Sequence, residues 1–221
     1  MATRQPAAKT SSARNGAVRD PEGTKAAILS AATREFMEKG FGGARIDAIA
    51  DHAKINKRML YHYFGGKEDL YLAVLENTYS AIRLAEAKLD LAHREPRDGL
   101  RELVQFTFRY FIEHPEFISL LGTENLLRGE FLKRSPRIVA MNSPLIDELR
   151  GVLERGAEAG VFRKNADPLD VYITMAALGF FPLSNRWTLS TVFGRDPGGK
   201  AESGRWADHI VDVLLRSLEP T

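Results

Sequence analysis

Cysteine is absent from this 221-residue chain. Its absence excludes disulfide bonds, thiolate metal sites and cysteine nucleophiles, and it is compatible with a reducing compartment. Long apolar runs are absent too, because the longest uncharged stretch, residues 171–185, is interrupted by Pro182. A membrane-spanning helix needs roughly 20 apolar residues. We therefore expect a cytoplasmic protein that has no membrane as a partner.

Motifs for catalysis or cofactor binding are also missing. The five histidines are scattered, no His-x-x-x-His pair occurs, and neither a phosphate-binding loop nor a nucleophile elbow is present. The sequence therefore predicts no catalytic residue, no metal site and no cofactor. A helical enzyme remains as one alternative class, and a helical scaffold that binds only proteins remains as another.

Positive charge is concentrated at the front of the chain. The net charge is +2, but residues 1–67 hold 12 basic against 6 acidic residues, net +6, and residues 68–221 hold 19 against 23, net −4. The front third is the part that would attract phosphate groups. A solvated surface explains the same counts, so charge alone does not decide between the two interpretations.

Helical periodicity begins only after the N-terminal segment. Residues 1–19 carry basic residues among small polar ones without any apolar block, which predicts a disordered basic arm and excludes a secretory signal. An apolar stripe then predicts a first helix over about residues 22–39, ended by Lys39 and Gly40.

Two short helices and a long one are predicted next. The spacing of Ile46 and Ile49 indicates a short helix, and Asn56 is a good N-cap for another that ends near His62. Gly65-Gly66 interrupts the pattern. A long helix with one apolar face then runs over residues 67–89.

The rest of the chain also shows helical periods and no alternating strand pattern. The predicted segments are about residues 98–113, 116–132, 144–159, 168–192 with a kink at Pro182, and 204–218. The sequence therefore predicts an all-α fold.

Residues 44–63 fit a helix-turn-helix, whose second helix enters the DNA major groove. The shared core of this motif is predicted to contain Ile46, Ile49, Ala50, Ile55 and Leu60. The residues left partly or wholly facing outward are Lys57, Arg58, Met59, Tyr61 and His62.

Lys57 and Arg58 stand in the first turn of the second helix, where unpaired N–H groups and the helix dipole favour anions. Each cation is unfavourable there by roughly 0.3 to 1 kcal/mol. Stability alone would favour Asp or Glu, whereas the cations and the dipole together suit phosphate and guanine edges. A protein-binding scaffold does not explain this placement, and two solvated cations on a surface helix are the remaining alternative.

The stretch "ILSAATREFMEKGFGGARIDAIADHAKINKRMLYHYFGGKEDLYLAVL", residues 28–75, closely resembles the N-terminal DNA-binding domain of the TetR family of transcriptional regulators. The shared pattern includes Phe-x-x-x-Gly-Phe, Leu-Tyr-x-Tyr-Phe and Lys-Glu-Asp-Leu. The resemblance implies a homodimer that binds a double-stranded DNA operator. It also implies repression that an unidentified small-molecule effector relieves.

The resemblance implies a division into a DNA-binding domain over residues 20–66 and a helical ligand-binding and dimerisation domain over residues 67–221. The predicted DNA-binding residues are Arg45, Asn56, Lys57, Arg58, Met59, Tyr61, His62, Tyr63 and Lys67. In this set Arg45 meets the phosphate backbone, Lys57, Arg58 and Met59 face base edges, and the two tyrosines with Lys67 hold flanking phosphates. The histidine takes either role or is simply solvated.

Three positions depart from the usual family pattern. Arg45 stands where threonine is common, Lys54 where glycine often makes the turn, and Arg58 where a small residue is frequent. Lys54 therefore implies modest strain in the turn, and the two arginines add charge.

The rear domain weakly resembles the RutR-like subgroup, in "HPEFISLLGTENLLRGEF" and "NRWTLSTVFGRD". Candidate ligand-binding residues are Phe117, Leu121, Glu124, Asn125, Arg128, Tyr172, Met175 and Trp187. Asn125 and Arg128 are taken to be one helical turn apart and able to bind one carbonyl or carboxylate jointly. The alternative is that the apolar members are core and that Arg128 pairs with Glu124 on the surface.

Dimerisation is expected on the last two long helices, as is usual in the family. The candidate residues are Ala176, Ala177, Gly179, Trp206, Ile210, Val213 and Leu214. Without a partner, the same apolar stripe is equally explained as core within one chain.

Overall fold

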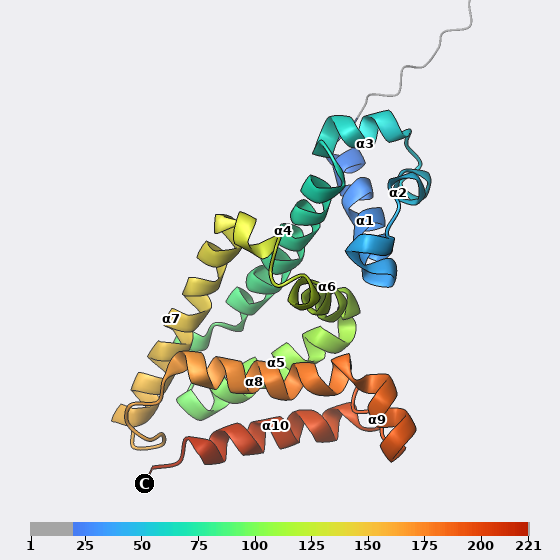
Figure 1. The fold of residues 1–221 in the computed structure, drawn as a ribbon. Helices are drawn as coiled ribbons and strands as arrows, with labels where there is room; N and C mark the ends of the chain where they lie inside the picture. Colours follow the sequence, from blue (N-terminus) through green and yellow to red (C-terminus); the bar gives the residue numbers. More distant parts are fainter. Residues whose placement is uncertain (1–19, 221) are drawn as a thin grey trace, which may run out of the picture.

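A computed structural model describes residues 20–220, and over that range every regular element is a helix (Figure 1). The predicted all-α fold is therefore confirmed. The basic arm predicted for residues 1–19 lies outside the described residues. Among the described helices none is long and apolar enough to cross a membrane.

Three helices form a small head at one end of the molecule: α1 Pro21–Gly43, α2 Ile46–His52 and α3 Lys57–Phe64. The first helix begins where Asp20 Oδ1 accepts a hydrogen bond from the Gly23 N–H at 2.9 Å. It extends past its predicted end, with a kink at Gly40, whose φ of 64° lies in the left-handed region.

Helix α4, Lys67–Glu86, leads from the head into the body (Figure 1). It is shorter than predicted, because residues 87–89 form a 3-10 turn, η1, and Asp90 then takes a left-handed conformation with φ 51°. A second turn, η2 Leu91–His93, completes the reversal into the next helix.

The body consists of α5 Pro96–Glu113, α6 Pro115–Leu126, the turn η3 Leu132–Arg134, α7 Pro136–Glu158, α8 Pro168–Ser184, α9 Arg186–Phe193 and α10 Ser203–Ser217. Helix α7 begins eight residues before its predicted start, because Ser135 caps it and Pro136 occupies the first helical position. The segment predicted over 116–132 ends at Leu126. The helix predicted over 168–192 is two helices that separate at Asn185 rather than one helix kinked at Pro182.

The apolar core of the head continues into the body. Leu60 and Phe36 of the head share one cluster with Tyr71 of α4 and with Phe131 and Ile138 beyond α6. A separate cluster fills the space between α5, α7, α8 and α10. The head therefore rests on buried side chains from beyond residue 66.

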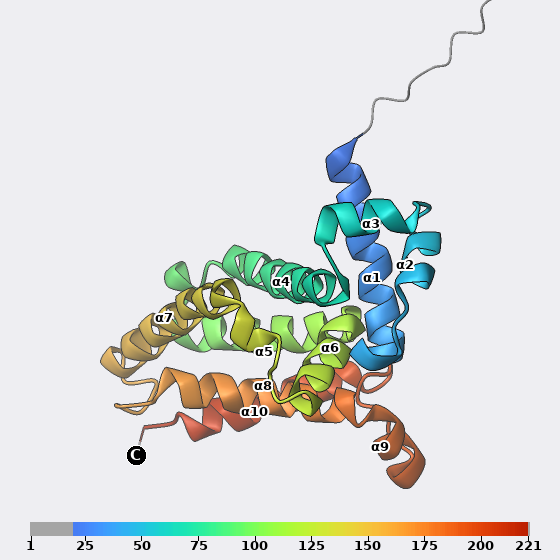
Figure 2. The same ribbon diagram turned by 45° about the horizontal axis from the view of Figure 1, so that its top comes forward.

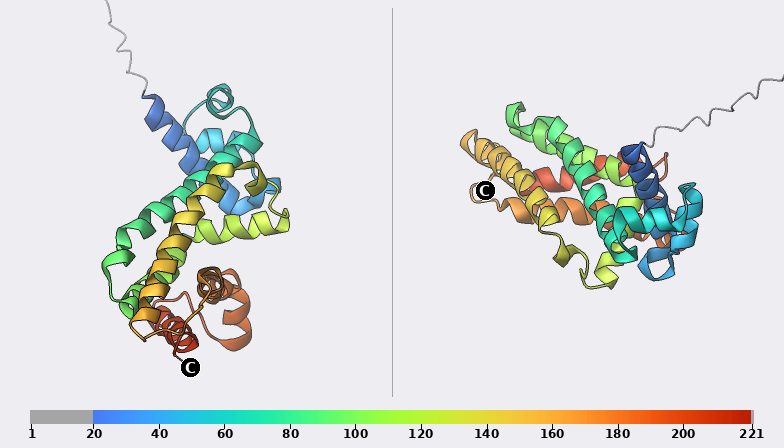
Figure 3. Two further views of the ribbon diagram at one scale, coloured as in Figure 1. Left: turned by 90° about the vertical axis from the view of Figure 1, so that its left-hand side faces the viewer. Right: turned by 90° about the horizontal axis from the view of Figure 1, so that it is seen from above.

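Helix α6 lies beside α1, as Figure 2 shows. The Ser119 hydroxyl of α6 donates a hydrogen bond to the Met37 carbonyl of α1 at 2.7 Å. Helices α4 and α7 also run side by side (Figure 3). The head is consequently joined to the body covalently through α4 and by packing against α6 and the residues that follow it.

Candidate functional site

Helix α3 is held in place by its buried side and by its cap. Asn56 Oδ1 accepts a hydrogen bond from the Met59 N–H at 2.9 Å, which fixes the first turn. Leu60 and Phe64 are buried in the head core. The opposite side of the helix is therefore presented to solvent, in the orientation that a helix entering a DNA groove requires.

The predicted DNA-binding residues lie together around this exposed side. Those that are exposed are Arg45, Asn56, Lys57, Arg58, Tyr61 and His62, and those that are half-buried are Met59, Tyr63 and Lys67. The Arg45 backbone N–H is fixed by the buried Glu35 carboxylate at 3.1 Å.

Lys57 is not a free cation, because its Nζ lies 2.8 Å from Asp47 Oδ1 on α2. Its hydrogen bond and charge hold the pKa of Asp47 below its ordinary value, and Asp47 in turn raises the pKa of Lys57. The placement of Lys57 at the start of α3 therefore has a structural explanation, which the sequence-based argument did not allow for. That argument still applies to Arg58, whose exposed side chain has no ion pair within residues 20–220.

Two predicted phosphate contacts also have structural roles in the head. The Lys67 ammonium stands 5.0 Å from the ring centroid of Phe41, a cation–π contact. Tyr63 packs against the head core, and its ring centroid lies 5.6 Å from that of His62. Lys54, in the turn between α2 and α3, has φ 55°, so the strain implied by the missing glycine is present.

The predicted ligand residues do not gather around one pocket. Phe117 and Met175 are buried in two different apolar clusters. Glu124 is buried as well, and its Oε2 accepts hydrogen bonds from the backbone N–H groups of Phe131 at 3.2 Å and Leu132 at 3.0 Å. Glu124 thus fixes the link after α6 from a buried position and does not form a surface pair with Arg128.

The expectation that Asn125 and Arg128 lie one helical turn apart was wrong. Helix α6 ends at Leu126, and Arg128 has a left-handed φ of 59°, so the two residues are not on successive turns of one helix. Both are exposed, and Asn125 Nδ2 donates to the Leu121 carbonyl at 2.8 Å, while Leu121 itself packs half-buried against an apolar cluster. Trp187, 78% exposed on α9, borders an open groove between α5, α6 and α9.

Tyr172 is different, because it contacts a buried ion pair that the sequence analysis missed. Arg83 Nη1 lies 2.7 Å from Glu86 Oε2, and the two side chains are only 9% and 4% exposed. Arg83 Nη2 donates to Tyr172 Oη at 3.3 Å. Burial raises the pKa of Glu86 to about 7. The positive charge of Arg83 opposes this rise, and the negative charge of Glu148 adds a smaller contribution to it. The available signal was an Arg-x-x-Glu spacing on a mostly apolar helix.

Comparison with known proteins agrees with this arrangement of a helix-turn-helix head on a helical body. Residues 28–74 match the family of bacterial regulatory proteins described as the tetR family, and residues 96–214 match the tetracyclin repressor-like C-terminal domain. The chain belongs to the TetR family. Members are transcriptional regulators rather than enzymes, so the enzyme alternative is set aside on that ground.

Several TetR-family relatives cover most of the chain. It is 40% identical over 195 residues to the HTH-type transcriptional repressor NicS of Pseudomonas putida, covering 88% of this chain and 92% of NicS. It is 31% identical over 156 residues to the HTH-type transcriptional regulator RutR of Escherichia coli, covering 71% of each. The solved structure of PfmR from Thermus thermophilus superposes with a TM-score of 0.61 at 27% identity, covering 86% of this chain and 97% of PfmR.

The residues predicted for TetR-type dimerisation lie mainly inside the subunit. Ile210 and Leu214 are buried in the body core, and the Trp206 indole N–H donates to the Leu178 carbonyl at 3.1 Å. Gly179 is buried, and a Cβ built there would stand 3.4 Å from the Phe111 ring. Val213 and Ala176 are half-buried, and only Ala177 is exposed. The α10 stripe is thus core within one chain, the alternative that the sequence left open.

Helix α8 carries an apolar row of which the prediction contained only Ala177. Leu169, Ile173, Ala177 and Phe181 follow one another at a spacing of four residues, and all four are exposed. A spacing of four places them on one side of the helix. A row of large exposed apolar residues marks an interaction surface more often than a free one.

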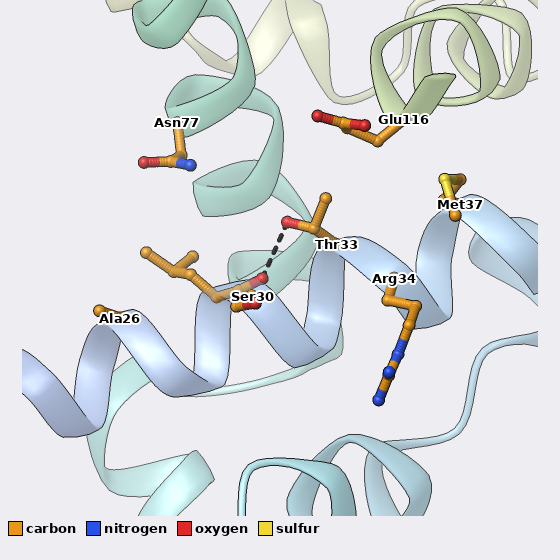
Figure 4. A pocket seen from close by; sticks show the side chains of 8 residues that line it. Ala26, Ser30, Thr33, Arg34, Met37, Asn77 and Glu116 are labelled. Atoms are coloured by element: carbon orange, nitrogen blue, oxygen red, sulfur yellow. Dashed lines mark hydrogen bonds between the residues drawn. The ribbon is translucent and has the colours of Figure 1, made fainter. Parts of the chain in front are cut away.

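A cleft of about 520 Å³ separates the head from the body where α1, α4 and α6 meet (Figure 4). Asn77 of α4 and Glu116 of α6 lie across it from Thr33 and Met37 of α1. The packing between head and body is therefore incomplete on this side, which leaves space for the head to change its angle.

Proposed function

We propose that this TetR-family protein is a ligand-responsive repressor that binds a palindromic DNA operator as a homodimer. The observation that carries the proposal is the exposed side of α3, where Arg58 has no ion pair with any residue of 20–220. The names of NicS and RutR, a transcriptional repressor and a transcriptional regulator, support it. A regulator of this kind acts in the cytoplasm, where bacterial DNA is.

In this proposal residues 20–66 are the DNA-binding domain, and residues 67–221 bind the effector and form the dimer. Helix α3 lies in the major groove, with the exposed Arg58 directed at base edges. Lys57 would exchange part of its contact with Asp47 for phosphate or base contacts. Arg45 and Lys67, at the starts of α2 and α4, would lie against the phosphate backbone.

The dimer is proposed to form through the apolar row of α8, Leu169, Ile173, Ala177 and Phe181, packed against the same row of a second copy. An interface between identical subunits buries the same patch on both of them. The row is apolar and exposed, as a homodimer interface requires before assembly. The two heads would then bind half-sites about one helical turn of DNA apart or slightly more.

Effector binding is proposed to act on the head through α4. Arg134, beyond α6, pairs with Glu68 at 2.8 Å in the first turn of α4, and the Ser135 hydroxyl donates to Glu76 Oε1 at 2.6 Å. A shift of α7 relative to α4 would therefore change these contacts and move the start of α4 next to the head. A ligand changes DNA affinity only by binding one head spacing better than the other, so its site must touch an element that moves.

The first test selects bound fragments from genomic DNA and measures their affinity at several salt concentrations. Arg58→Ala should weaken binding to the selected site by about 1–3 kcal/mol and relax its base preference. The matched control is Arg109→Ala on α5, also an exposed arginine, which should change neither property. Specific binding that survives Arg58→Ala with its base preference intact would contradict the assignment of α3 as the reader.

A further inference from the structure

An acidic side chain stands within the surface that is proposed to meet DNA. Asp47 is the second residue of α2, and its side chain is 57% exposed. The sequence analysis did not include it among the DNA-binding residues. A carboxylate in such a surface weakens binding to every DNA sequence, because its repulsion of phosphate does not depend on the bases. Its position beside α3 therefore calls for a compensating contribution.

Asp47 and Lys57 present an acceptor and a donor side by side. Lys57 is the first residue of α3, at the end of the helix that enters the groove, and its Nζ lies 2.8 Å from Asp47 Oδ1. An ammonium has three N–H donors and a carboxylate has two oxygens, so this contact uses only part of each group. The hydrogen bond and charge of Lys57 hold the pKa of Asp47 below its ordinary value, so the ionised carboxylate only accepts hydrogen bonds.

A G·C base pair presents the complementary groups in the major groove. Guanine offers the O6 and N7 acceptors, and the cytosine paired with it offers the N4 donor. O6 and N4 are hydrogen-bonded to each other, so they stand about 2.7–3.2 Å apart. The 2.8 Å between Lys57 Nζ and Asp47 Oδ1 matches this separation. Both residues can therefore contact one base pair without breaking the contact between them.

The other base pairs fit this donor and acceptor less well. When the G·C pair is reversed, the carboxylate faces guanine acceptors and the ammonium faces the cytosine donor, so both contacts are repulsive. When adenine lies at the carboxylate, its N6 is a suitable donor but its N7 acceptor faces the same carboxylate. When adenine lies at the ammonium, thymine O4 faces the carboxylate. One base pair in one orientation is therefore favoured.

We infer that Asp47 is a specificity-determining residue that reads one base pair of the operator together with Lys57. The Lys57 ammonium donates to O6 and N7 of a guanine, and the Asp47 carboxylate accepts from N4 of the cytosine paired with it. In naming these bases, the inference rests on the proposed function. Helix α2 then takes part in base recognition alongside α3.

The test uses the full chain and the duplex selected from genomic DNA, with each operator position replaced in turn by the other three base pairs. Competition fluorescence anisotropy gives the discrimination at each position, which is the ratio of one protein's affinities for two duplexes. This ratio decides, because loss of a carboxylate raises the affinity for all duplexes together. The natural sequence should prefer G·C at one position of each half-site by about tenfold or more, as a good base contact does.

Variants then identify the residues that read this position. Asp47→Ala and Lys57→Ala should each reduce the discrimination there by about fivefold or more and leave the other positions unchanged. The matched control, Asp51→Ala, removes the same charge from another exposed position of α2 and should keep the discrimination of the natural sequence.

Three results would overturn the inference. One is full discrimination retained by Asp47→Ala, and another is a loss in the two variants at different positions. The third is a loss spread equally over all positions, because a contact that only orients α3 acts on every base pair which that helix reads.

The DNA selection keeps this inference distinct from the proposed function. If the natural sequence selects no specific DNA, the proposed function and the inference fail together. If specific DNA is selected and Arg58→Ala relaxes its base preference while Asp47→Ala does not, the proposed function stands and only the inference fails.

Discussion

Titration of the buried Glu86 should make the stability of the protein depend on pH. Burial raises its pKa from the ordinary value of 4.5 to about 7. In the pH range between these two values the folded chain holds a proton that the unfolded chain has released, so stability falls as pH rises. The full cost of ionising the buried group is present only above pH 7.

The size of the effect follows from the difference of about 2.5 in pKa at 1.36 kcal/mol for each unit, about 3 kcal/mol in all. Part of this cost already applies at pH 5, which leaves a loss of about 2.5 kcal/mol in unfolding free energy between pH 5 and pH 8. The contribution of Glu86 cannot be read from the pH dependence of the natural sequence alone, because other groups titrate over the same range.

The assay is urea unfolding at fixed protein concentration for the natural sequence and for Glu86→Gln, at about pH 5 and about pH 8. The difference between the two proteins should change by about 2.5 kcal/mol over that range, in favour of Glu86→Gln at the higher pH. Glu130→Gln, an exposed glutamate beyond α6, is the control and should show no such change. A difference that is the same at both pH values would refute the reasoning that burial controls the Glu86 proton.

Three further predictions concern the head and the dimer. Asp47→Asn frees the Lys57 ammonium and removes a charge that repels phosphate, so operator affinity should rise and its salt dependence should steepen. Fluorescence-anisotropy titrations at several salt concentrations measure both, and an unchanged affinity would contradict this prediction. Lys54→Gly removes left-handed strain at φ 55° and should raise the unfolding free energy by about 1 kcal/mol. The control is Lys39→Gly at an exposed position within α1, which should lower the unfolding free energy by about 1 kcal/mol. Ile173→Asp places a charge in the α8 row and should give monomers in sedimentation velocity, whereas a dimer that persists would place the interface elsewhere.

The helix-turn-helix could be predicted from the sequence because its signals are local. Asn56 caps α3 as expected, the Gly65-Gly66 pair separates α3 from α4, and Leu60 is buried while Arg58 is exposed. The ion pair of Lys57 with Asp47 was missed because it depends on how two helices are oriented across a turn. Sequence spacing alone does not contain that orientation.

The body was predicted less well because its contacts join distant parts of the chain. Arg83 and Tyr172 are 89 positions apart, so their contact has no local signal. An apolar stripe such as that of α10 shows that a side of the helix is covered, but not whether the same chain or a second one covers it. The helix predicted over 144–159 missed the true start of α7 at Ser135-Pro136, although a serine followed by a proline is a usual start of a helix.

The shared core at the junction of head and body limits how TetR-family parts can be exchanged. Phe131 and Ile138 belong to the apolar cluster that contains Leu60. The Ser119 hydroxyl also donates a hydrogen bond to the Met37 carbonyl. A chimera joined at residue 66 would replace seven of the 17 buried residues of that cluster with side chains of another protein. A functional exchange of DNA specificity should therefore transplant the surface of α3 alone, or move the head together with α4 and residues 115–138.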